Sequence, residues 1–259
     1  MQMKHFWINI DRNTERRQFM TEQFARFGLE NHRVSAYTPA DFDEILVQTR
    51  PLTCKYPGCV TCEFEFACLC SHLKAMEEGI KTGDAYFAIV EDDIYMPFKI
   101  DYDALISDMP HNTEILQMLI LYGNSVKMLY NIHQHSGQRY LKWQYLLPST
   151  GLYIISREGA QRLLNLFKDP LTHKYDFSQS PHQIVADVLL YMTAVTYATM
   201  HPYAFPNIDM GSEIHSDHLI AQAKAIRDIK EVMVLHYSKP FPFVKESVNR
   251  EELENTSAK

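Results

Sequence analysis

The chain has 259 residues, of which 46% are hydrophobic, and a formal net charge of −7. This length fits one large α/β domain or two small ones, and the hydrophobic fraction is ordinary for a globular protein with a core. The dispersed acidic charge argues against a nucleic-acid partner, which would require a basic face. No apolar run is long enough to cross a bilayer, and the first residues lack the apolar region of a signal peptide. We therefore expect a cytoplasmic protein.

Strands and helices alternate along the predicted chain. Apolar runs predict strands at residues 6–10, 32–37, 86–90, 115–121, 152–155 and 197–203. Cap residues and amphipathic spacing predict helices at residues 15–27, 71–80, 157–167, 181–193 and 217–229. Residues 38–62 have poor periodicity and are expected to form a long loop. This alternation predicts an α/β fold with a mixed, mostly parallel central sheet flanked by helices.

We expect one domain over residues 1–245, with a cysteine-bearing loop at residues 51–70 and a polar, flexible tail at residues 246–259. All five cysteines lie in that loop, and an odd, clustered count does not fit a disulfide framework. Their spacing allows a structural zinc site formed by Cys54, Cys59, Cys62 and Cys68. Cys70 or His72 is an alternative fourth ligand. The later cysteines are equally compatible with buried, small apolar residues.

Three acidic residues, Glu91, Asp92 and Asp93, follow the strand at residues 86–90 directly. Neighbouring carboxylates raise the cost of ionising one another, and a divalent cation removes that cost. Alternate side chains of an extended segment share a face, so Glu91 and Asp93 can bind one ion while Asp92 points elsewhere. Asn9 ends the first strand and is expected at the same edge, where α/β sheets bind ligands. A solvated strand end with an acidic turn is the alternative.

Several segments resemble, in order, glycosyltransferase family 25, the lipopolysaccharide and collagen galactosyltransferase-like group. They are residues 6–17, with an Asn-Ile-Asp-Arg turn, residues 67–75, with Ser-His, residues 89–94, with the three acids, and residues 151–160, with Gly-Leu-Tyr. Looser similarity follows at residues 186–190 and 212–214, so the resemblance covers about residues 4–216. Ala67 replaces the family's usual glycine, and residues 35–39 lack its customary Asp-Gly.

The resemblance implies a nucleotide-sugar glycosyltransferase with a GT-A-like fold. Such enzymes hold Mn²⁺ or Mg²⁺ on a short acidic motif, here Glu91 and Asp93, and Asp92 would contact the ribose or sugar of the donor. The cation stabilises the negative charge that develops on the leaving nucleotide diphosphate. A UDP-sugar, with UDP-galactose favoured, is the implied donor, and a glycan or glycolipid such as lipooligosaccharide is the implied acceptor.

The resemblance also implies inversion at the anomeric carbon, which needs a general base to accept the proton of the acceptor hydroxyl. Asp187 matches the family's acid before a leucine-rich turn and is the candidate. A helix acid paired with Gln183, one turn earlier, is the alternative.

Four other residues are candidates for binding the donor. Asn9 and Arg16 are placed to contact the nucleotide, although Arg16 equally fits a surface position of its helix. Ser71 and His72 are predicted at a helix N-terminus, where a diphosphate binds readily. Otherwise Ser71 is only a cap and His72 only a packed side chain.

Two other functions compete. A Mg²⁺-dependent phosphohydrolase or nucleotidyltransferase would use the same acidic strand end, but the chain has no Gly-Lys-Ser/Thr loop and no Asp-x-Asp-x-Thr segment. A zinc-stabilised binding module would bind zinc without turnover. Lys224, Arg227 and Lys230 on the last helix offer peripheral contact with the inner membrane, or are simply solvated. The oligomeric state is not predicted.

Overall fold

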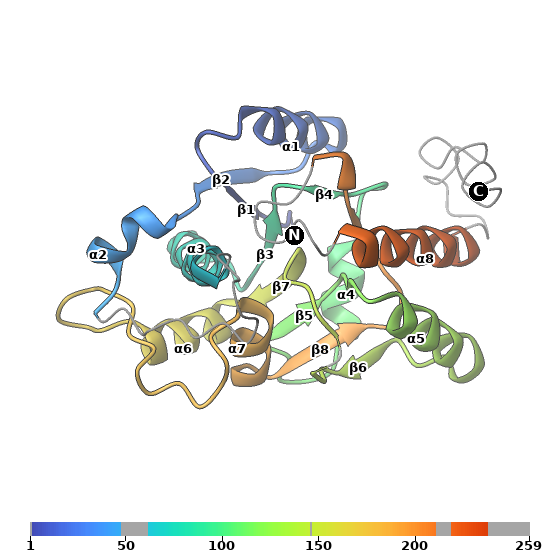
Figure 1. The fold of residues 1–259 in the computed structure, drawn as a ribbon. Helices are drawn as coiled ribbons and strands as arrows, with labels where there is room; N and C mark the ends of the chain where they lie inside the picture. The colour runs from blue at the N-terminus through green and yellow to red at the C-terminus, as the bar shows by residue number, and fades with distance from the viewer. Residues whose placement is uncertain (1, 48–61, 146, 211–218, 238–259) are drawn as a thin grey trace.

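The computed structural model describes residues 2–47, 62–145, 147–210 and 219–237. A seven-stranded central sheet lies between two layers of helices (Figure 1). Its strand order is β2-β1-β3-β7-β5-β8-β6, and a small second sheet pairs β4 with β9. In the described part of the chain, no helix has the length and apolar character needed to span a membrane.

The elements have the following bounds. The strands are β1 (His5–Asn9), β2 (Asn31–Ser35), β3 (Tyr86–Glu91), β4 (Ile94–Tyr95), β5 (Ile115–Gln117), β6 (Tyr140–Lys142), β7 (Leu152–Ser156), β8 (Thr196–Thr199) and β9 (Phe205–Pro206). The helices are α1 (Thr14–Phe27), α2 (Phe42–Ile45), α3 (Cys62–Lys81), α4 (Tyr102–Asp108), α5 (Gly123–Ser136), α6 (Arg157–Phe167), α7 (Ala186–Thr193) and α8 (Leu219–Tyr237). Short 3₁₀ turns occupy Pro39–Asp41 and Ile208–Met210.

The sheet is mixed, with one dominant strand direction. β1 pairs in parallel with β2 and β3, and β5 pairs in parallel with β8, whereas β7 is antiparallel to both β3 and β5. β6 is antiparallel to β8. Five of the seven strands therefore run one way, and β6 and β7 run the other. The predicted α/β class with a mixed, mostly parallel sheet flanked by helices is confirmed. The carboxyl ends of β1 and β3 and the amino end of β7 therefore share one edge.

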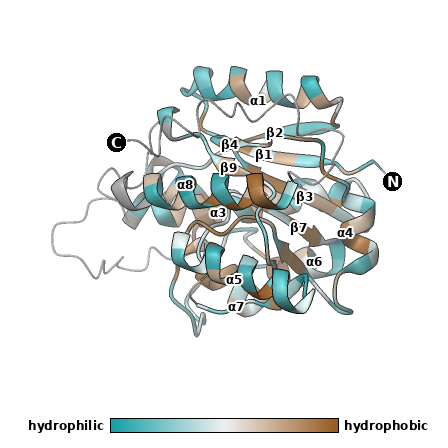
Figure 2. Cartoon of the chain, turned by 90° about the vertical axis from the view of Figure 1, so that its right-hand side faces the viewer, coloured by the Kyte–Doolittle hydropathy of each residue, from teal (hydrophilic) through white to brown (hydrophobic). Residues whose placement is uncertain are grey.

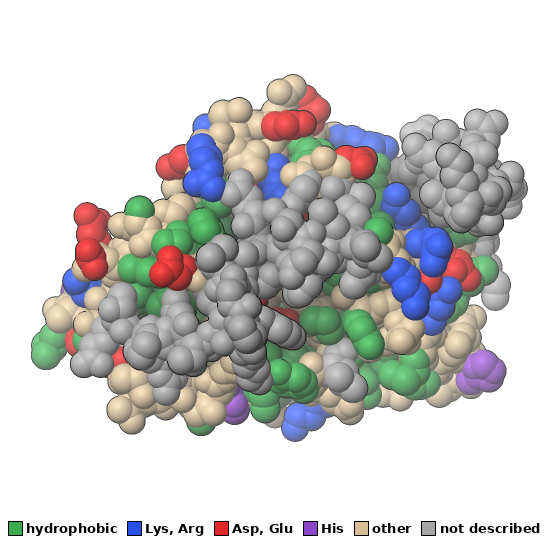
Figure 3. Space-filling model, viewed as in Figure 1, with side chains coloured by type: hydrophobic (Ala, Val, Ile, Leu, Met, Phe, Trp, Pro, Cys, Tyr) green, Lys and Arg blue, Asp and Glu red, His purple; other side chains and the backbone are tan. Residues whose placement is uncertain are grey.

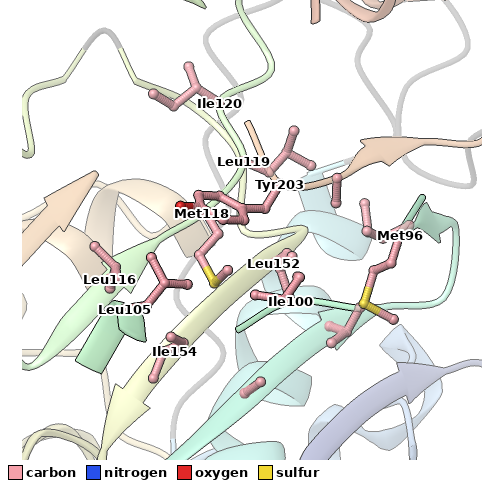
Figure 4. Packing of buried hydrophobic residues seen from close by; sticks show 14 of the residues in the cluster. Met96, Ile100, Leu105, Leu116, Met118, Leu119, Ile120, Leu152, Ile154 and Tyr203 are labelled. Carbon is pink, nitrogen blue, oxygen red and sulfur yellow. The ribbon is translucent and has the colours of Figure 1, made fainter. Parts of the chain in front are cut away.

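Alternation along the strands creates a core on each face of the sheet. On one face, Trp7 and Val90 pack with residues of α1, α5 and α8. On the other, Phe6 and Ile89 pack with residues of α3, α6 and α7. The hydrophobic centre and hydrophilic outer helix faces are clear in Figure 2. Figure 4 shows the first core around β7, where Leu152 and Ile154 meet side chains from β5 and the segment that follows it. Because both faces are buried at the centre of the sheet, the central strands β3 and β7 are almost continuously apolar.

Local signals set several helix ends where they were expected. The Asn13 side chain accepts a hydrogen bond from the backbone N–H of Arg16 and caps α1, and Gly28 ends that helix with φ of 60°. That left-handed conformation suits glycine, which has no Cβ. Ser156 caps α6 by accepting from the backbone N–H of Gly159. The strands predicted around residues 6–10, 86–90 and 152–155 are likewise present.

Other predicted boundaries are wrong. Helix α3 begins at Cys62, so the helix expected from Ser71 is twice as long and residues 62–70 are not a loop. The helix expected from residue 181 begins only at Ala186, and the strand expected over residues 115–121 ends at Gln117. Residues 38–47 contain a 3₁₀ turn and α2. The polar tail at residues 246–259 lies outside the described residues.

Candidate active site

A cavity of about 770 Å³ lies at the sheet edge where β1 and β3 end and β7 begins. Its walls come from the ends of these strands, from α3 and from the first turns of α1, α5, α7 and α8. The polar residues that line it include Arg16, Glu65, Ser71, Glu91, Asp92, Asp93, Asn124, Ser149, Thr150, Asp187 and Lys224. The acidic cluster and Asp187, distant in sequence, therefore share one cavity, as expected of a single site.

Asp92 is held by two side chains that reach it from the first segment of the chain. Its Oδ2 accepts a hydrogen bond of 2.6 Å from Nδ2 of Asn9, and its Oδ1 accepts one of 2.6 Å from a guanidinium nitrogen of Arg16. All three residues are buried. Burial raises the pKa of Asp92, although the charge of Arg16 and the bond from Asn9 oppose that rise. Arg16 is thus not a surface helix residue, and this alternative is wrong.

Asn9 lies behind Asp92 instead of lining the cavity. Its exposed fraction is 1%, and its Oδ1 accepts a 2.8 Å hydrogen bond from Arg33. Both ends of the amide have partners within the chain, and the direct nucleotide contact of Asn9 stays a prediction. What the structure shows is that Asn9 holds one oxygen of Asp92.

Glu91 is fixed by side chains from the segment before β7 and from α3. Oγ1 of Thr150 donates a 2.7 Å hydrogen bond to Oε1 of Glu91, and Nε2 of His72 lies 3.3 Å from the same oxygen. Burial alone would raise the pKa of Glu91, but His72, Thr150 and the charge of Arg16 together outweigh it and lower the pKa. The carboxylate is therefore held in its charged form and at a defined position.

Asp93 is the least compensated acid of the cluster. The guanidinium of Arg16 is 3.8 Å from its Oδ2, farther than from Asp92. Burial, followed by the charges of Glu91 and Asp92, raises the pKa of Asp93 to about 7, against the lowering effect of Arg16. The described residues compensate the negative charge at this position only in part, which is the condition that a bound cation relieves.

Asp187 is in the first turn of α7 and faces the cavity. Its Oδ1 accepts a 2.8 Å hydrogen bond from the backbone N–H of Val188, and its Oδ2 accepts a long one of 3.4 Å from that of Ser149. Burial is the largest effect on its pKa, which is raised despite these two bonds. Gln183 precedes the helix, so the expected pairing one helical turn away is not formed.

Ser71 and His72 lie inside α3, so the expectation of a helix N-terminus at this point is wrong. The Ser71 hydroxyl donates to the backbone carbonyl of Ala67 and accepts from the backbone N–H of Tyr37. His72 is fully buried, with Nδ1 3.1 Å from the hydroxyl of Tyr153. Ser71 still lines the cavity. However, the backbone N–H groups beside Ser71 and His72 belong to the interior of a helix and not to its N-terminus. The predicted diphosphate contact therefore stays a prediction, and a helix N-terminus does not support it.

Two groups of metal-ligating side chains occur in the described part of the chain, and one is in this cavity. Atoms of Cys68, His72 and Glu91 lie within 4.8 Å of one another. Of the four cysteines predicted to bind structural zinc, Cys54 and Cys59 fall outside the described residues, as does the side chain of Cys62. Cys68 instead faces the acidic cluster, where burial raises the pKa of its thiol well above the ordinary value.

Sequence reasoning missed the segment before β7. Ser149 has a φ of 114°, which is rare for a residue with a side chain, and its hydroxyl accepts from the backbone N–H of Gly151. The same segment places Thr150 against Glu91. A Cβ on Gly151 would lie 2.7 Å from a methyl carbon of Ile94, so a larger residue there would require the Ile94 side chain to shift. The run Pro-Ser-Thr-Gly offered a turn signal, but nothing local showed which acid it would contact.

Residues 2–178 match the model of glycosyltransferase family 25, described as an LPS biosynthesis protein family. This match covers more than half of the chain, so the chain belongs to glycosyltransferase family 25. It is a nucleotide-sugar-dependent glycosyltransferase. The match includes Arg16 and the acids that follow β3 and ends before Asp187.

Comparison with solved structures adds two distant likenesses. A glycosyltransferase involved in glycosylation of the major capsid of PBCV-1 is 10% identical with a TM-score of 0.35, covering 66% of this chain and 68% of that one. Mouse xyloside xylosyltransferase 1 in its apo form is 11% identical with a TM-score of 0.28, covering 65% and 57%. At such TM-scores neither likeness supports the assignment, which rests on the family model. A search of curated proteins gives no match.

Proposed function

We propose that this glycosyltransferase is metal-dependent, has a GT-A-like fold and transfers a hexose, with inversion, from a UDP-sugar to a glycan acceptor. UDP-galactose as donor and lipooligosaccharide as acceptor are the specific candidates. The observation that carries the proposal is the charge of the cavity at the strand ends. Glu91, Asp93 and Asp187 line it together with Glu65, while Arg16 is already paired with Asp92.

A nucleotide diphosphate is itself negatively charged, so it cannot approach these carboxylates without a counter-charge. A divalent cation supplies one, and carboxylate oxygens are ligands that Mg²⁺ and Mn²⁺ prefer. The chain's own groups fit such an ion. Glu91 and Asp93 both line the cavity, and the Nε2 of the buried His72 lies 3.3 Å from Oε1 of Glu91. Bound there, the ion would stabilise charge on the leaving diphosphate.

Asp187 supports the inverting part of the proposal. It lines the same cavity as the acidic cluster but belongs to a different wall, on α7. Its raised pKa brings the carboxylate closer to the range in which a general base is efficient at neutral pH. In this position it accepts the proton of the acceptor hydroxyl as that oxygen attacks the anomeric carbon.

The acceptor's location at a membrane is supported by exposed basic residues of α8. Lys224 and Arg227 are exposed on this helix, and Lys224 also lines the cavity. Lysine and arginine side chains gather over α8 in Figure 3. These charges favour an anionic membrane surface on the side from which a lipid-linked acceptor would enter. Sedimentation with anionic and neutral vesicles tests the contact, and equal binding to both refutes it.

The direct test is a donor screen. After treatment with EDTA, the protein is assayed with UDP-, GDP- and CMP-sugars, with and without Mn²⁺, and release of the nucleotide is measured. We expect turnover of a UDP-sugar that requires the added cation. Turnover at the same rate in EDTA would refute the metal dependence, and turnover confined to GDP- or CMP-sugars would refute the donor.

Asp93→Ala tests where the cation binds. We expect at least about a hundredfold loss of transfer, because an electrostatic stabiliser of the transition state is removed, with an unchanged far-UV circular dichroism spectrum. Asp43→Ala is the control, because Asp43 is exposed on α2 and does not line the cavity. Unchanged turnover of Asp93→Ala would remove Asp93 from the site.

A further inference from the structure

The second group of metal-ligating side chains lies outside the cavity. His133 of α5, His201 after β8 and His236 of α8 offer nitrogen atoms that all lie within 4.8 Å of one another. The three residues come from distant parts of the sequence, and no feature of the proposed transfer reaction uses them. Their ring centroids are 3.8 Å apart for His201 and His236, and 5.2 Å and 5.3 Å from His133 to these two.

We propose that His133, His201 and His236 form a zinc site that joins α5, α8 and the segment after β8. Imidazole nitrogens are preferred ligands of Zn²⁺, and three histidines with one open position are a known zinc coordination. The proposal concerns a site separate from the candidate active site, and it does not depend on the proposed function.

The buried histidine provides the strongest indication of a ligand. His201 has an exposed fraction of only 6%, and its Nδ1 has no hydrogen-bond partner among the residues that the structure describes. An unpaired polar atom in such a place costs folding free energy. A bound cation would relieve that cost.

The His133 ring is oriented by a hydrogen bond of its own. Nδ1 of His133 is 2.7 Å from the backbone carbonyl oxygen of Gln138, to which it donates. This bond leaves the lone pair on Nε2, the arrangement that a second partner imposes on most zinc-ligating histidines. His133 and His236 are half-buried, so solvent zinc has access. Zn–N bonds of about 2.0–2.1 Å place tetrahedral ligands about 3.3 Å apart, and rotation of these two rings can close the remaining gap.

The rings of His201 and His236 are also held in the neutral form that zinc requires. Burial, followed by the charges of the other two histidines and of Arg139, lowers the pKa of His201 well below its ordinary value. Burial lowers the pKa of His236 to about 4, with the charge of His133 as the second cause. Zinc would therefore not need to displace a proton from either ring at neutral pH.

The position of the site gives zinc a structural consequence. Helices α5 and α8 lie side by side in Figures 1 and 2, and Lys127 of α5 bridges Asp228 and Glu231 of α8 at 2.9 Å and 2.8 Å. At the start of α5, a Cβ on Gly123 would clash with a carboxylate oxygen of Asp228, in the middle of α8, and would lie 3.4 Å from the Cα of Ala225, so the helices approach closely. Gly123 of α5 and Ala225 of α8 both line the active-site cavity. Zinc bound by the histidines would fix the helix pair that forms this wall.

The experiment uses the full chain, stripped with EDTA, and Zn²⁺ alone as the probe. Bound zinc is measured by mass spectrometry after dialysis, affinity by calorimetry and the melting temperature with and without zinc. The variants are His133→Gln and His236→Gln. His135→Gln is the matched control, because His135 is exposed on the same helix and is not a member of the group.

We expect the wild type and His135→Gln to bind one more zinc ion than either ligand variant. At a hundredfold excess over Kd, zinc should raise their melting temperature by about 5–10 °C. Equal zinc content in all four proteins would overturn the proposal. His133 is half-buried near the end of its helix, so we expect His133→Gln to retain the fold. Circular dichroism of this variant without zinc verifies that.

Cobalt distinguishes this site from one that contains thiolates. Co²⁺ bound by three histidines gives visible d–d absorption without a sulfur-to-metal charge-transfer band, whereas a site that includes cysteine shows that band. We expect wild-type protein to show d–d absorption from cobalt that has no sulfur ligand. His133→Gln should lose this absorption. If all bound cobalt shows the sulfur band, and His133→Gln leaves the spectrum unchanged, metal is held elsewhere and the proposal fails.

Discussion

The buried pair of Arg16 and Asp92 gives the sharpest test of how the site is built. The two side chains are 9% and 10% exposed and approach to 2.6 Å. Truncating one partner of a buried pair costs about 3–5 kcal/mol. For Arg16→Met we expect the lower end, about 3 kcal/mol, because Asn9 still holds the other oxygen of Asp92. At about 2–4 °C per kcal/mol for a domain of this size, the melting temperature should fall by about 6–12 °C.

Urea unfolding followed by circular dichroism measures the loss, with Arg26→Met as control. Arg26 is exposed on the same helix, so its replacement should stay within about 0.5 kcal/mol. Combining Arg16→Met with Asp92→Asn should cost less than the sum of the two single changes, since the double variant leaves no unpaired buried charge. The reasoning is refuted if Arg16→Met is as stable as Arg26→Met, or if the stability losses of Arg16→Met and Asp92→Asn simply add in the double variant. In either case the ion pair does not stabilise this part of the site.

Three further outcomes are expected. Asp187→Asn should lower the transfer rate by about 10²–10⁴ if Asp187 is the base, and a loss under tenfold contradicts that role. Thr150→Val should weaken Mn²⁺ binding, measured calorimetrically, by about 10–100-fold, because Glu91 loses its 2.7 Å hydrogen bond. Thr150→Ser, which keeps the hydroxyl, should bind Mn²⁺ as the wild type does. Equal Mn²⁺ affinities of Thr150→Val and the wild type would refute the reasoning. Burial lowers the pKa of His5 from 6.5 to about 4. The unfolded chain therefore binds more protons between these values, and stability present above pH 6.5 is lost as pH falls toward 4. Relative to His5→Gln, the wild type should lose about 2 kcal/mol more from pH 7 to pH 5 in urea unfolding, and parallel curves contradict this.

The parts of the fold that the sequence predicted are those set by local signals. β1, β3 and β7 are mostly apolar runs, and α6 begins directly after Ser156, whose side chain caps it. The helices α4 and α5 and three short strands were not predicted, and the strands depend on partners far along the chain. β4 and β9 have two residues each and exist because they pair with each other, and β6 has three residues paired with β8. A strand so short has no periodicity to detect.

Helix α3 shows a different limit. Its first turns, from Cys62 to Cys70, belong to the cysteine-bearing loop that the sequence predicts, where the cysteine spacing allows a zinc site. The residues themselves are compatible with a helix, and Phe66 and Leu69 bury against the sheet one turn apart. Tertiary packing decided the conformation, as it often does where propensity is weak. The error moved Ser71 from a helix cap to a helix interior and removed the basis for a diphosphate contact there.

The sequence alone predicts the acidic residues of the candidate site, but it does not predict which side chains contact them. Three adjacent carboxylates after an apolar strand indicate a ligand site from local sequence alone. The partners of Asp92 lie 83 and 76 residues earlier, at Asn9 and Arg16. The helical pattern of α1 cannot distinguish a buried arginine from an exposed one until the position of the acid is known. The family motif contained both segments, which is why the resemblance placed them together when the residue pattern could not.

The direction of β7 explains why Thr150 escaped notice. In a parallel sheet, ligands bind beyond the carboxyl ends of the strands, so a search for site residues looks after each strand. β7 runs against β3, and its amino end therefore lies at the acidic edge. The backbone N–H of Glu91 donates to the carbonyl of Gly151, directly before β7, and Thr150 contacts the same acid. In a mixed sheet, the residues that precede an antiparallel strand are thus candidates of equal standing with those that follow a parallel one.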